Sequence, residues 1–395
     1  MPKFKPSPIS PARLVAFDVL LAVEGGSYAS DDLRLRSVTL SGRDAGLAAQ
    51  IVFGCLRFQS QLDYLIAKYS GRTVVDLDPS VKVALRGAIF QMRYLERVPA
   101  HAAVDNSVEF VKKRKRAATG LTNAVLRKVN RDVVDWPDRA RALSCPEWML
   151  SRWQKSFGEA QTIGIAQSAL AEPQHYVRIP QGQATPMELA LEATAVAGCW
   201  RVSDSLPETL RFHDIGSQSI VPNLDLHAGH TLLDLCAAPG NKMAQALETP
   251  LGLAVAGDVS LERLRTVAAR CDRVVLDATA TLPFGKKFDR VLVDAPCTGT
   301  GTLAGNPEIK WRIRPTDFER FQEKQRTILG NALRVLAPAG KLVYATCSLE
   351  HEENEDVVKA VLAKFPEWRC EKETYRIPGR DEGDGFYAAV ISGQR

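Results

Sequence analysis

The sequence has no pair of cysteines in C-x-x-C spacing, although its 395 residues include eight cysteines. Neither a cysteine-rich zinc site nor a disulfide framework is therefore indicated. None of the six histidines stands in a metal-ligand pattern, so we expect no bound metal. Cysteines without obvious partners fit a reducing compartment, and we expect a cytoplasmic protein.

The sequence also has no apolar run that approaches the roughly 18 residues of a membrane span, so we expect no membrane association. Near the N-terminus, Lys3 and Lys5 precede the apolar run 14–23, which contains Asp18 and lacks a small-residue cleavage site. This run indicates a helix and not a signal peptide. With 45% hydrophobic and 25% charged residues, the chain is typical of a globular protein, and it is long enough for two or three domains.

Charge is distributed unevenly along the chain. Residues 1–135 carry 21 Lys and Arg against 13 Asp and Glu, whereas the remainder carries 30 against 33. The front part includes the basic run "KKRKR" at 112–116. A basic front part suggests contact with a polyanion, although such a run is also typical of a solvated helix face.

The first 140 residues have the three- and four-residue spacing of apolar side chains that predicts helices. Ser10 and Pro11 indicate the start of the first helix, and Gly25 and Gly26 its end. We therefore predict an all-α bundle over 1–140. The residue pattern changes over 141–225, where we expect a small α+β insert. Its expected elements are helices 146–157 and 159–172, strand 175–180, helix 185–198, and strands 199–203 and 208–213.

From about residue 226, strand-like and helix-like runs alternate, which predicts βαβ units and a parallel sheet over 226–395. The run 231–240 is expected to be a strand that leads into a turn, and further strands are expected at 253–259, 273–278, 288–297, 341–348 and 385–392.

Chemically useful residues follow these strands. They are the turn "CAAPGNK" at 236–242, Asp258, Asp277, Asp294 with Cys297, and Cys347. In an open doubly wound sheet, ligands bind beyond the carboxyl ends of the strands. We therefore expect these residues to share one rim of the sheet.

The first turn lacks the G-x-G-x-x-G pattern that a dinucleotide requires, because Gly240 is its one glycine. Asp258 can accept hydrogen bonds from two ribose hydroxyls, and Asp277 can meet an adenine amino group. S-adenosylmethionine fits this pattern better than NAD, although another nucleoside cofactor is an alternative. Helix N-capping is the structural alternative for both acids.

Two thiols on this rim favour methylation of a pyrimidine carbon. Carbon 5 becomes nucleophilic only after a nucleophile adds at carbon 6, and a thiolate both attacks and leaves readily. Asp294 lies three residues before Cys297 and could stabilise charge at ring N3. A buried structural role is the alternative for each thiol.

The segments "LLDLCAAPGNK", "DAPCTGTGTL", "NPEIKWR", "YATCSLEHEENEDVV" and "DGFYAAV" resemble the signature blocks of RNA (cytosine-C5) methyltransferases of the Nop/Sun class. The basic helical front part is similar to the NusB antitermination factor, as in the Sun-like, bacterial small-subunit (16S) rRNA branch. The resemblance implies a NusB-like RNA-binding domain at 1–140, a small RNA-facing subdomain at 141–225 and a class I (Rossmann-like) methyltransferase domain at 226–395.

The resemblance also implies roles for individual residues. Cys347 matches the nucleophile of the family, Cys297 the second cysteine that releases the product, and Asp294 the carboxyl group at the base. The residues implied in S-adenosylmethionine binding are Cys236, Ala237, Ala238, Pro239, Gly240, Asn241, Lys242, Asp258, Asp277 and Asp294.

Three positions depart from the family pattern. Asn241 stands where glycine is usual, Ala304-Gly305 where basic residues are usual, and His213 where glutamine is usual.

We therefore expect a monomeric enzyme that methylates carbon 5 of a cytosine in RNA, most simply small-subunit rRNA, through a covalent adduct between cysteine and carbon 6. A tRNA substrate is one alternative. A ribosome-assembly factor that binds RNA without turnover is another.

Overall fold

The computed structural model describes residues 9–180, 182–183, 186, 189–203, 206, 210–267 and 270–393. The chain forms two compact units. The first comprises residues up to 171 together with 304–312, and the second comprises 172–303 and 313–395. No helix in the described ranges is long and apolar enough to cross a bilayer.

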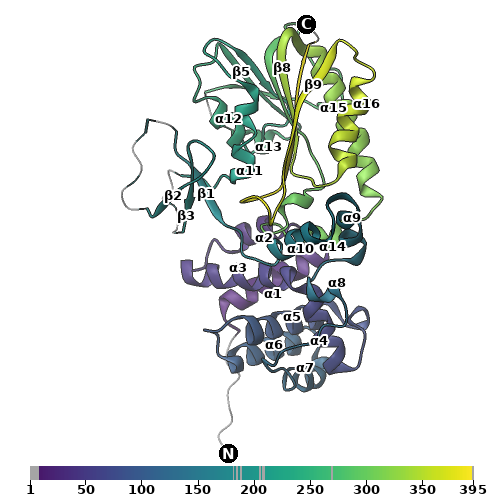
Figure 1. Ribbon diagram of the computed structural model, residues 1–395. Coiled ribbons are helices and arrows are strands. Elements are labelled where there is room, and N and C mark those ends of the chain that lie inside the picture. The colour runs from purple at the N-terminus through teal and green to yellow at the C-terminus, as the bar shows by residue number, and fades with distance from the viewer. Residues whose placement is uncertain are drawn as a thin grey trace, which may run out of the picture. The chain divides into compact units, whose positions relative to one another are not determined.

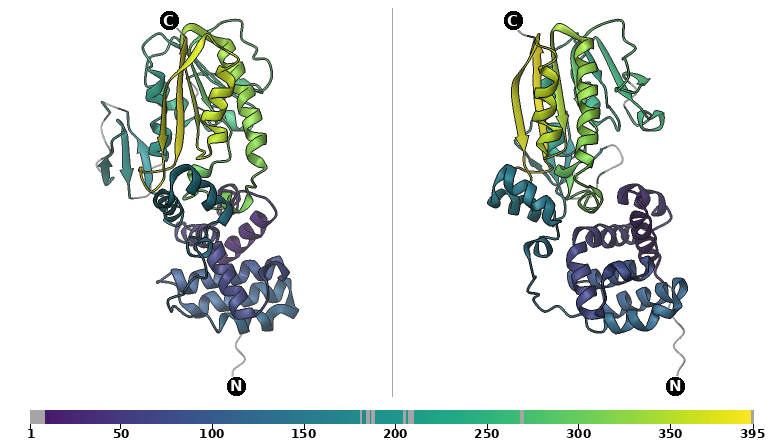
Figure 2. Two further views of the ribbon diagram at one scale, coloured as in Figure 1. Left: turned by 45° about the vertical axis from the view of Figure 1, so that its right-hand side comes forward. Right: turned by 90° about the vertical axis from the view of Figure 1, so that its right-hand side faces the viewer.

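The first unit is helical, as predicted, and Figures 1 and 2 show its helices packed in layers. Its helices are α1 (Pro11–Glu24), α2 (Ala29–Arg36), α3 (Gly42–Arg57), α4 (Gln59–Ser70), α5 (Pro79–Tyr94), α6 (Ala100–Arg114), α7 (Thr119–Leu126), α8 (Arg139–Ala142), α9 (Glu147–Phe157), α10 (Glu159–Ser168) and α14 (Ile309–Arg312). Their apolar faces meet in one core, in which Phe17 of α1 lies against Phe110 of α6 with ring centroids 4.8 Å apart. The hydroxyl group of Ser10, at the predicted N-cap of α1, accepts from Arg13 and makes no cap bond.

Residues 304–312 complete this helical unit from far along the chain. Lys310 Nζ donates to Arg57 O at 2.9 Å, and Trp311 Nε1 donates to Leu56 O at 2.7 Å. Both carbonyl groups belong to the last turn of α3, where a helix leaves its acceptors unpaired. At the start of α2, Glu308 Oε1 accepts from Ala29 N at 3.2 Å. The segment therefore caps two helices of a unit that is otherwise formed by residues up to 171.

The second unit contains two sheets, drawn in Figures 1 and 2. The smaller is antiparallel, in the order β1-β3-β2, with β1 (His175–Arg178), β2 (Leu191–Ala193) and β3 (Cys199–Val202). The helix expected over 185–198 is wrong, because residues 191–193 form β2; residues 184–185 and 187–188 lie outside the described ranges. Residues 208–209 of the strand expected over 208–213 lie outside the described ranges, and Phe212 makes one isolated bridge to Val177.

The larger sheet has seven strands in the order β6-β5-β4-β7-β8-β10-β9. The strands are β4 (Thr231–Asp234), β5 (Leu253–Asp258), β6 (Asp272–Val275), β7 (Phe288–Asp294), β8 (Leu336–Thr346), β9 (Trp368–Arg376) and β10 (Phe386–Gly393). Strands β4 to β8 pair in parallel, and β10 pairs antiparallel with both β8 and β9. A mostly parallel sheet in this order confirms the predicted Rossmann-like α/β architecture.

Helices cover both faces of this sheet. They are α11 (Ile215–Gln218), α12 (Asn241–Ala246), α13 (Leu261–Leu264), α15 (Asp317–Val335) and α16 (Glu355–Leu362). Figures 1 and 2 show α15 and α16 side by side on one face. Val291 and Val293 of β7 join the core beneath these two helices, whereas Leu292 between them joins the core beneath α12 and α13. This alternation explains the continuous apolar runs of the sequence, because strands buried on both faces need apolar side chains in both directions.

Two boundaries differ from the prediction. The structure groups residues 141–171 with the helical unit and 172–225 with the larger sheet, so the insert expected over 141–225 is divided between the units. Strand β8 begins at Leu336 and includes "APAG", so it starts five residues before the strand expected over 341–348. The register between β7 and β8 shifts there, so the extra residues are absorbed as a strand irregularity.

Candidate active site

The carboxyl ends of the parallel strands bring most of the predicted residues around one cavity of about 390 Å³. Of the twelve predicted site residues, eight line it: Cys236, Ala238, Lys242, Asp258, Asp277, Asp294, Cys297 and Cys347. Asp294, the last residue of β7, is paired with Ala345, two residues before Cys347. The strand register therefore places this acid and this thiol together at one rim of the sheet.

The loop after β4 is held by backbone contacts. Ala237 N donates to Gly257 O at 2.9 Å, and Arg263 donates to Ala238 O at 2.8 Å. Gly240 has a φ of +104°, and a Cβ there would lie 2.8 Å from Val267 Cα. Glycine is therefore required at the turn where α12 begins.

The two acids that follow β5 and β6 lie in different surroundings. Asp258 is buried and accepts from Ser260 N at 3.0 Å and from Ala238 N at 3.3 Å, which leaves further acceptor capacity on its carboxylate. Asp277 is exposed and accepts from the backbone and hydroxyl group of Thr279. Ser260 is the N-cap of α13, and no helix begins within the described residues 276–287, so N-capping explains neither acid.

The two thiols lie side by side. Cys297 Sγ and Cys347 Sγ are 3.3 Å apart, on the loops that follow β7 and β8. The hydrogen bond with Cys347 and burial raise the pKa of Cys297 well above its ordinary value. Backbone contacts hold the loops together, because Gly301 N donates to Cys347 O at 2.9 Å and Gly385 N donates to Gly301 O at 2.8 Å.

Lys242 reaches across the cavity to the acid of the adjacent loop. Its Nζ lies 2.7 Å from Asp294 Oδ2 and 5.0 Å from the centroid of the Phe386 ring. Lys242 is 8% exposed, so this ion pair is shielded from water and screened less than a surface pair. The pairing makes Lys242 a partner of the predicted catalytic acid, a relation that the sequence does not indicate.

Asp234, at the end of β4, is a buried carboxyl group beneath the cavity. Burial, assisted by the charge of Asp294 and opposed by that of Lys242, raises its pKa to about 8. Its oxygen Oδ1 accepts from Cys236 N at 3.3 Å. Asp234 therefore supports the start of the cofactor loop from below.

The lining of the cavity fits S-adenosylmethionine. Its volume lies within the usual range for small-molecule sites. Carboxylate oxygens of Asp258 and Asp277 suit ribose hydroxyls and an adenine amino group, and Leu276, Ala278 and Ile328 supply apolar surface for a ring. Ala237, Pro239 and Gly240 shape the loop, while Asn241 points elsewhere.

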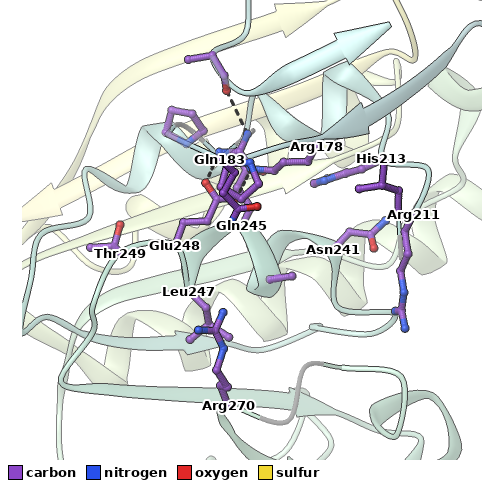
Figure 3. Close-up of a pocket in the computed structure, with 15 residues that line it drawn as sticks. Arg178, Gln183, Arg211, His213, Asn241, Gln245, Leu247, Glu248, Thr249 and Arg270 are labelled. Carbon is purple, nitrogen blue, oxygen red and sulfur yellow. Dashed lines mark hydrogen bonds and ion pairs between the residues drawn. The ribbon is translucent and has the colours of Figure 1, made fainter. Parts of the chain in front are cut away.

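Asn241 and His213 belong to a second, larger cavity of about 730 Å³ on the other side of α12, shown in Figure 3. Asn241 Nδ2 donates to Phe212 O at 3.2 Å, and its φ is negative, so the side chain is accommodated without backbone strain. Arg178 pairs with Glu248 at the edge of this cavity. Neither thiol nor Asp294 is among the described residues that line it, so size alone does not identify the active site.

His213 is buried and contacts Ser217 Oγ at 3.0 Å through Nε2. Burial, reinforced by the positive charges of Lys242 and Arg178, lowers its pKa to about 3. The neighbouring residues Asp214 and Gln218 also make structural hydrogen bonds. Asp214 caps α11, and Gln218 Nε2 donates to His213 O. These residues act as supports and do not line the smaller cavity.

In the helical unit, the basic run 112–116 ends α6. Arg114 pairs with Asp18 at 2.6 Å, and Lys115 lies 3.6 Å from Asp78, so part of the run also holds helices together. At Ala304-Gly305, where basic residues are usual in the family, Ala304 O accepts from Arg57 at 3.0 Å.

Sequence reasoning missed several residues around the site. Phe386, Arg263 and Lys324 line the cavity, although none of them follows an expected parallel strand directly. Glu353 lies behind the thiol loops, bonded to both. The "DGFYAAV" and "HEENE" segments were visible as motifs, but which of their side chains turn inward depends on the fold.

Comparison with known proteins follows the same division of the chain. Residues 221–392 match the family described as "16S rRNA methyltransferase RsmB/F", and residues 10–131 match the NusB family. Ribosomal RNA small subunit methyltransferase B of Shigella flexneri serotype 5b is 32% identical over 411 residues, covering 93% of this chain and 95% of that protein. The same enzyme of Klebsiella pneumoniae is 30% identical over 424 residues, covering 97% and 98%.

Solved structures share the fold. The crystal structure of PH0851 superposes with a TM-score of 0.81 at 22% identity, covering 98% of this chain and all of that one. A methyltransferase homologue from Pyrococcus horikoshii has a TM-score of 0.57 at 22% identity, covering 65% of this chain and 97% of its own. The two matched regions follow one another in the chain in the same order as the two units of the structure. The protein is therefore an RNA methyltransferase of the RsmB/F family that uses S-adenosylmethionine, and its helical front domain belongs to the NusB family.

Proposed function

We propose that the protein methylates carbon 5 of a cytosine in 16S rRNA, with Cys347 forming a covalent bond to carbon 6 of the base. The observation that carries this proposal is the pair of thiols 3.3 Å apart beside the Lys242–Asp294 ion pair, at one cavity. Methylation of an amine or hydroxyl group needs no thiol, because those atoms are already nucleophilic.

The two thiols have different roles in this proposal. The raised pKa of Cys297 keeps it protonated near neutral pH, so it can donate a hydrogen bond to Cys347. A thiolate is the nucleophilic form of cysteine, and we assign the attack to Cys347. This assignment agrees with the family resemblance, in which the T-C-S cysteine is the nucleophile.

Asp294 faces the pyrimidine ring in this proposal. Addition of a thiolate at carbon 6 builds negative charge toward N3, and a proton shared there stabilises it. Lys242, 2.7 Å from Asp294, fixes the orientation of the carboxyl group and supplies a positive charge beside it. The pair is oriented before the base arrives, so little reorganisation is needed during reaction.

The cofactor would be held by the loop 236–242 together with Asp258 and Asp277. S-adenosylmethionine supplies an electrophilic methyl group when bound there. The turn at Gly240 and the hydrogen bond from Ala238 N to the buried carboxylate of Asp258 hold the loop, which would orient the methyl donor toward the thiols.

The bonds balance as follows. The Cys347 sulfur bonds to carbon 6 while N3 gains a proton, which converts the ring into an enamine. Carbon 5 would then bond to the methyl group as the bond between that methyl group and the cofactor sulfur breaks, and carbon 5 would lose its proton to a base. Finally the sulfur–carbon 6 bond breaks, the C5=C6 double bond returns, and N3 gives up its proton. Cys297 assists this last stage by protonating or holding the departing sulfur.

RNA would reach the site as an unstacked nucleotide, because enzymes that do chemistry on a base take it out of the stack. The helical unit would bind the surrounding rRNA. Lys113 and Arg116 supply exposed charge there, and clustered cations of this kind bind phosphates. We propose that one copy of the chain suffices, since both thiols and all the predicted cofactor ligands lie in one chain.

The direct test is to incubate the protein with S-adenosylmethionine and unmodified 16S rRNA or bulk tRNA, digest the RNA, and measure 5-methylcytidine by mass spectrometry. We expect 5-methylcytidine in 16S rRNA with the wild type and none with Cys347→Ser. Cys370→Ser, a half-buried thiol of β9, is the matched control and should retain activity. Product only in tRNA would change the substrate, and no product in either RNA would contradict the reaction.

A further inference from the structure

Glu353 is a fully buried acid directly behind the two thiol loops. It ends the short 3-10 helix His351–Glu353 and is 0% exposed. Four donors converge on its carboxylate from three segments of the chain. Four hydrogen bonds satisfy the acceptor capacity of a buried carboxylate.

The donors come from the residues that follow each thiol. Thr298, next to Cys297, donates its backbone N–H to Glu353 Oε1 at 2.9 Å and its hydroxyl group to Oε2. Ser348, next to Cys347, donates its hydroxyl group to Oε2 at 2.5 Å. The Oε2 atom of Glu353 therefore accepts hydrogen bonds from both thiol loops.

The remaining contacts fix the carboxylate and the backbone around it. Gln325 of α15 donates to Oε1 at 3.0 Å, and Tyr344 of β8 donates its hydroxyl group to Glu353 O at 2.6 Å. The next residue, Asn354, donates to Ser348 O at 3.0 Å. Glu353 therefore links α15 and β8 to both thiol loops.

We propose that Glu353 is a positioning residue that holds Cys297 and Cys347 at their working separation, a role that rests on the covalent mechanism proposed above. Glu353 does not line the cofactor cavity, and its bonds end on Thr298 and Ser348. It acts through its neighbours and touches neither base nor cofactor. Besides the hydrogen bond with Cys347 and burial, its charge also raises the pKa of Cys297, so it helps keep that thiol protonated.

The test compares Glu353→Ala and Glu353→Gln with Glu355→Gln. The glutamine keeps an acceptor for Thr298 N and Gln325, and the two hydroxyl groups can turn to accept from its amide. Glu355 is an acid two residues away that bonds Tyr375 instead, which makes Glu355→Gln the matched control.

Glu353→Ala should lower the turnover rate by about 100-fold while the dissociation constant for S-adenosylmethionine stays unchanged, because the thiol loops move and the cofactor loop does not. Glu353→Gln should fall between Glu353→Ala and wild type, and Glu355→Gln should equal wild type. In the Cys297→Ala background, Glu353→Ala should slow formation of the protein–RNA adduct.

A second readout does not depend on turnover. Diamide oxidises two adjacent thiols to a disulfide and is itself reduced to a hydrazine, and peptide mapping then measures the Cys297–Cys347 disulfide. Glu353→Ala should form it several-fold more slowly than wild type, because the sulfurs are no longer held 3.3 Å apart.

Wild-type turnover in Glu353→Ala would overturn the proposal. An equal loss of turnover in Glu353→Ala and Glu353→Gln, together with loss of cofactor binding, would also overturn it, because that result indicates a purely structural role. If Glu353→Ala does not fold, Glu353→Gln decides: reduced turnover with unchanged cofactor affinity supports the proposal, and unchanged turnover overturns it. If wild type makes no 5-methylcytidine but the disulfide yield still depends on Glu353, the proposed function fails while the positioning role stands.

Discussion

Lys242 occupies the point where the cofactor loop and the catalytic loop meet. It begins on the first turn of α12 and ends 2.7 Å from Asp294 on the loop after β7. A lysine at this place therefore pairs with the acid that we propose faces the base, and it also lies on the loop that we propose holds the cofactor. The family resemblance assigns it to cofactor binding, and the geometry adds the second task.

Removal of either partner of this pair should have nearly the same effect. We expect Lys242→Met and Asp294→Asn each to lower the single-turnover methylation rate by about 100-fold, the typical size for a general acid–base or charge-stabilising group. The double variant should be little worse than either single one, since interacting residues are not additive. Rapid-quench measurement of 5-methylcytidine gives the three rates. Fully additive losses would show that the two residues act independently.

His213 links pH to the stability of the methyltransferase unit. Its pKa is about 3 in the folded protein and about 6.5 in an unfolded chain. Between these pH values the unfolded state binds more protons than the folded state. The contribution of His213 to the free energy of unfolding is therefore fully present above pH 6.5 and is lost as the pH decreases toward 3. Each pH unit in this window costs up to about 1.4 kcal/mol.

The variant His213→Gln removes the titrating group and restores the residue that is usual in the family. We expect the wild type to lose more stability between pH 7 and pH 4.5 than His213→Gln does. Urea unfolding at four pH values, followed by circular dichroism, measures the difference. Identical pH dependence in the two proteins would show that His213 is accessible to protons in the folded state.

At the scale of elements, three loops meet at Gly301. A Cβ on this residue would lie 2.4 Å from Gly385 O and 2.9 Å from Cys347 O. Both contacts are closer than a carbon and a carbonyl oxygen tolerate, and both involve backbone atoms that cannot rotate away. The loop after β7 is therefore packed between the loop after β8 and the start of β10.

We expect Gly301→Ala to separate the thiol loops and to lower turnover by about 100-fold, as misplacement of reacting groups by about 1 Å typically does. Gly330→Ala is a suitable control, because a Cβ there meets only the edge of the Phe365 ring at 3.6 Å. Activity and melting temperature should be measured together. An active Gly301→Ala variant would mean that the loops can separate without harm.

Prediction from sequence worked where side-chain patterns determine the element. Strands β4, β5, β7 and β8 are largely buried, so their apolar runs are continuous and the residues after them could be assigned to one rim. Strand β9 was missed because "WRCEKETYR" is rich in charge; it lies at the edge of the sheet, where polar side chains meet solvent. The helix expected at 185–198 failed because residues 191–193 pair with β3, and strand pairing overrides their helix propensity.

The site itself was predictable in part. Residues that follow parallel strands were found, but side chains that arrive from the antiparallel part of the sheet or from behind were not. Phe386 begins β10, and Glu353 belongs to a 3-10 helix with its side chain buried behind the loops. No spacing rule relates such positions to the rim, because packing alone determines which way they turn.

At the scale of the whole chain, the helical unit is discontinuous. Residues 304–312 follow the loop of Cys297 in the sequence and end as a cap on α2 and α3. Burial of Lys310 lowers its pKa to about 8, which reflects how completely the segment is enclosed. A fragment cut at residue 171 therefore lacks part of its own fold.

We expect a fragment of residues 1–171 to melt at a lower temperature alone than in the presence of a synthetic peptide of residues 302–314. The peptide restores the bonds from Lys310 and Trp311 to the last turn of α3. A peptide with Trp311→Ala and Lys310→Ala is the matched control and should stabilise the fragment less. Equal melting temperatures with and without the native peptide would contradict this account.

The most direct test of the central claim follows from the two thiols. Cys297→Ala and Cys347→Ala should each be incubated with S-adenosylmethionine and unmodified 16S rRNA, and the mixtures resolved on a denaturing gel. The account predicts that Cys297→Ala stays covalently attached to RNA, because Cys347 attacks carbon 6 and is not released, and that Cys347→Ala forms no adduct. An adduct with Cys347→Ala alone would reverse the two roles, and an adduct with neither would contradict covalent catalysis.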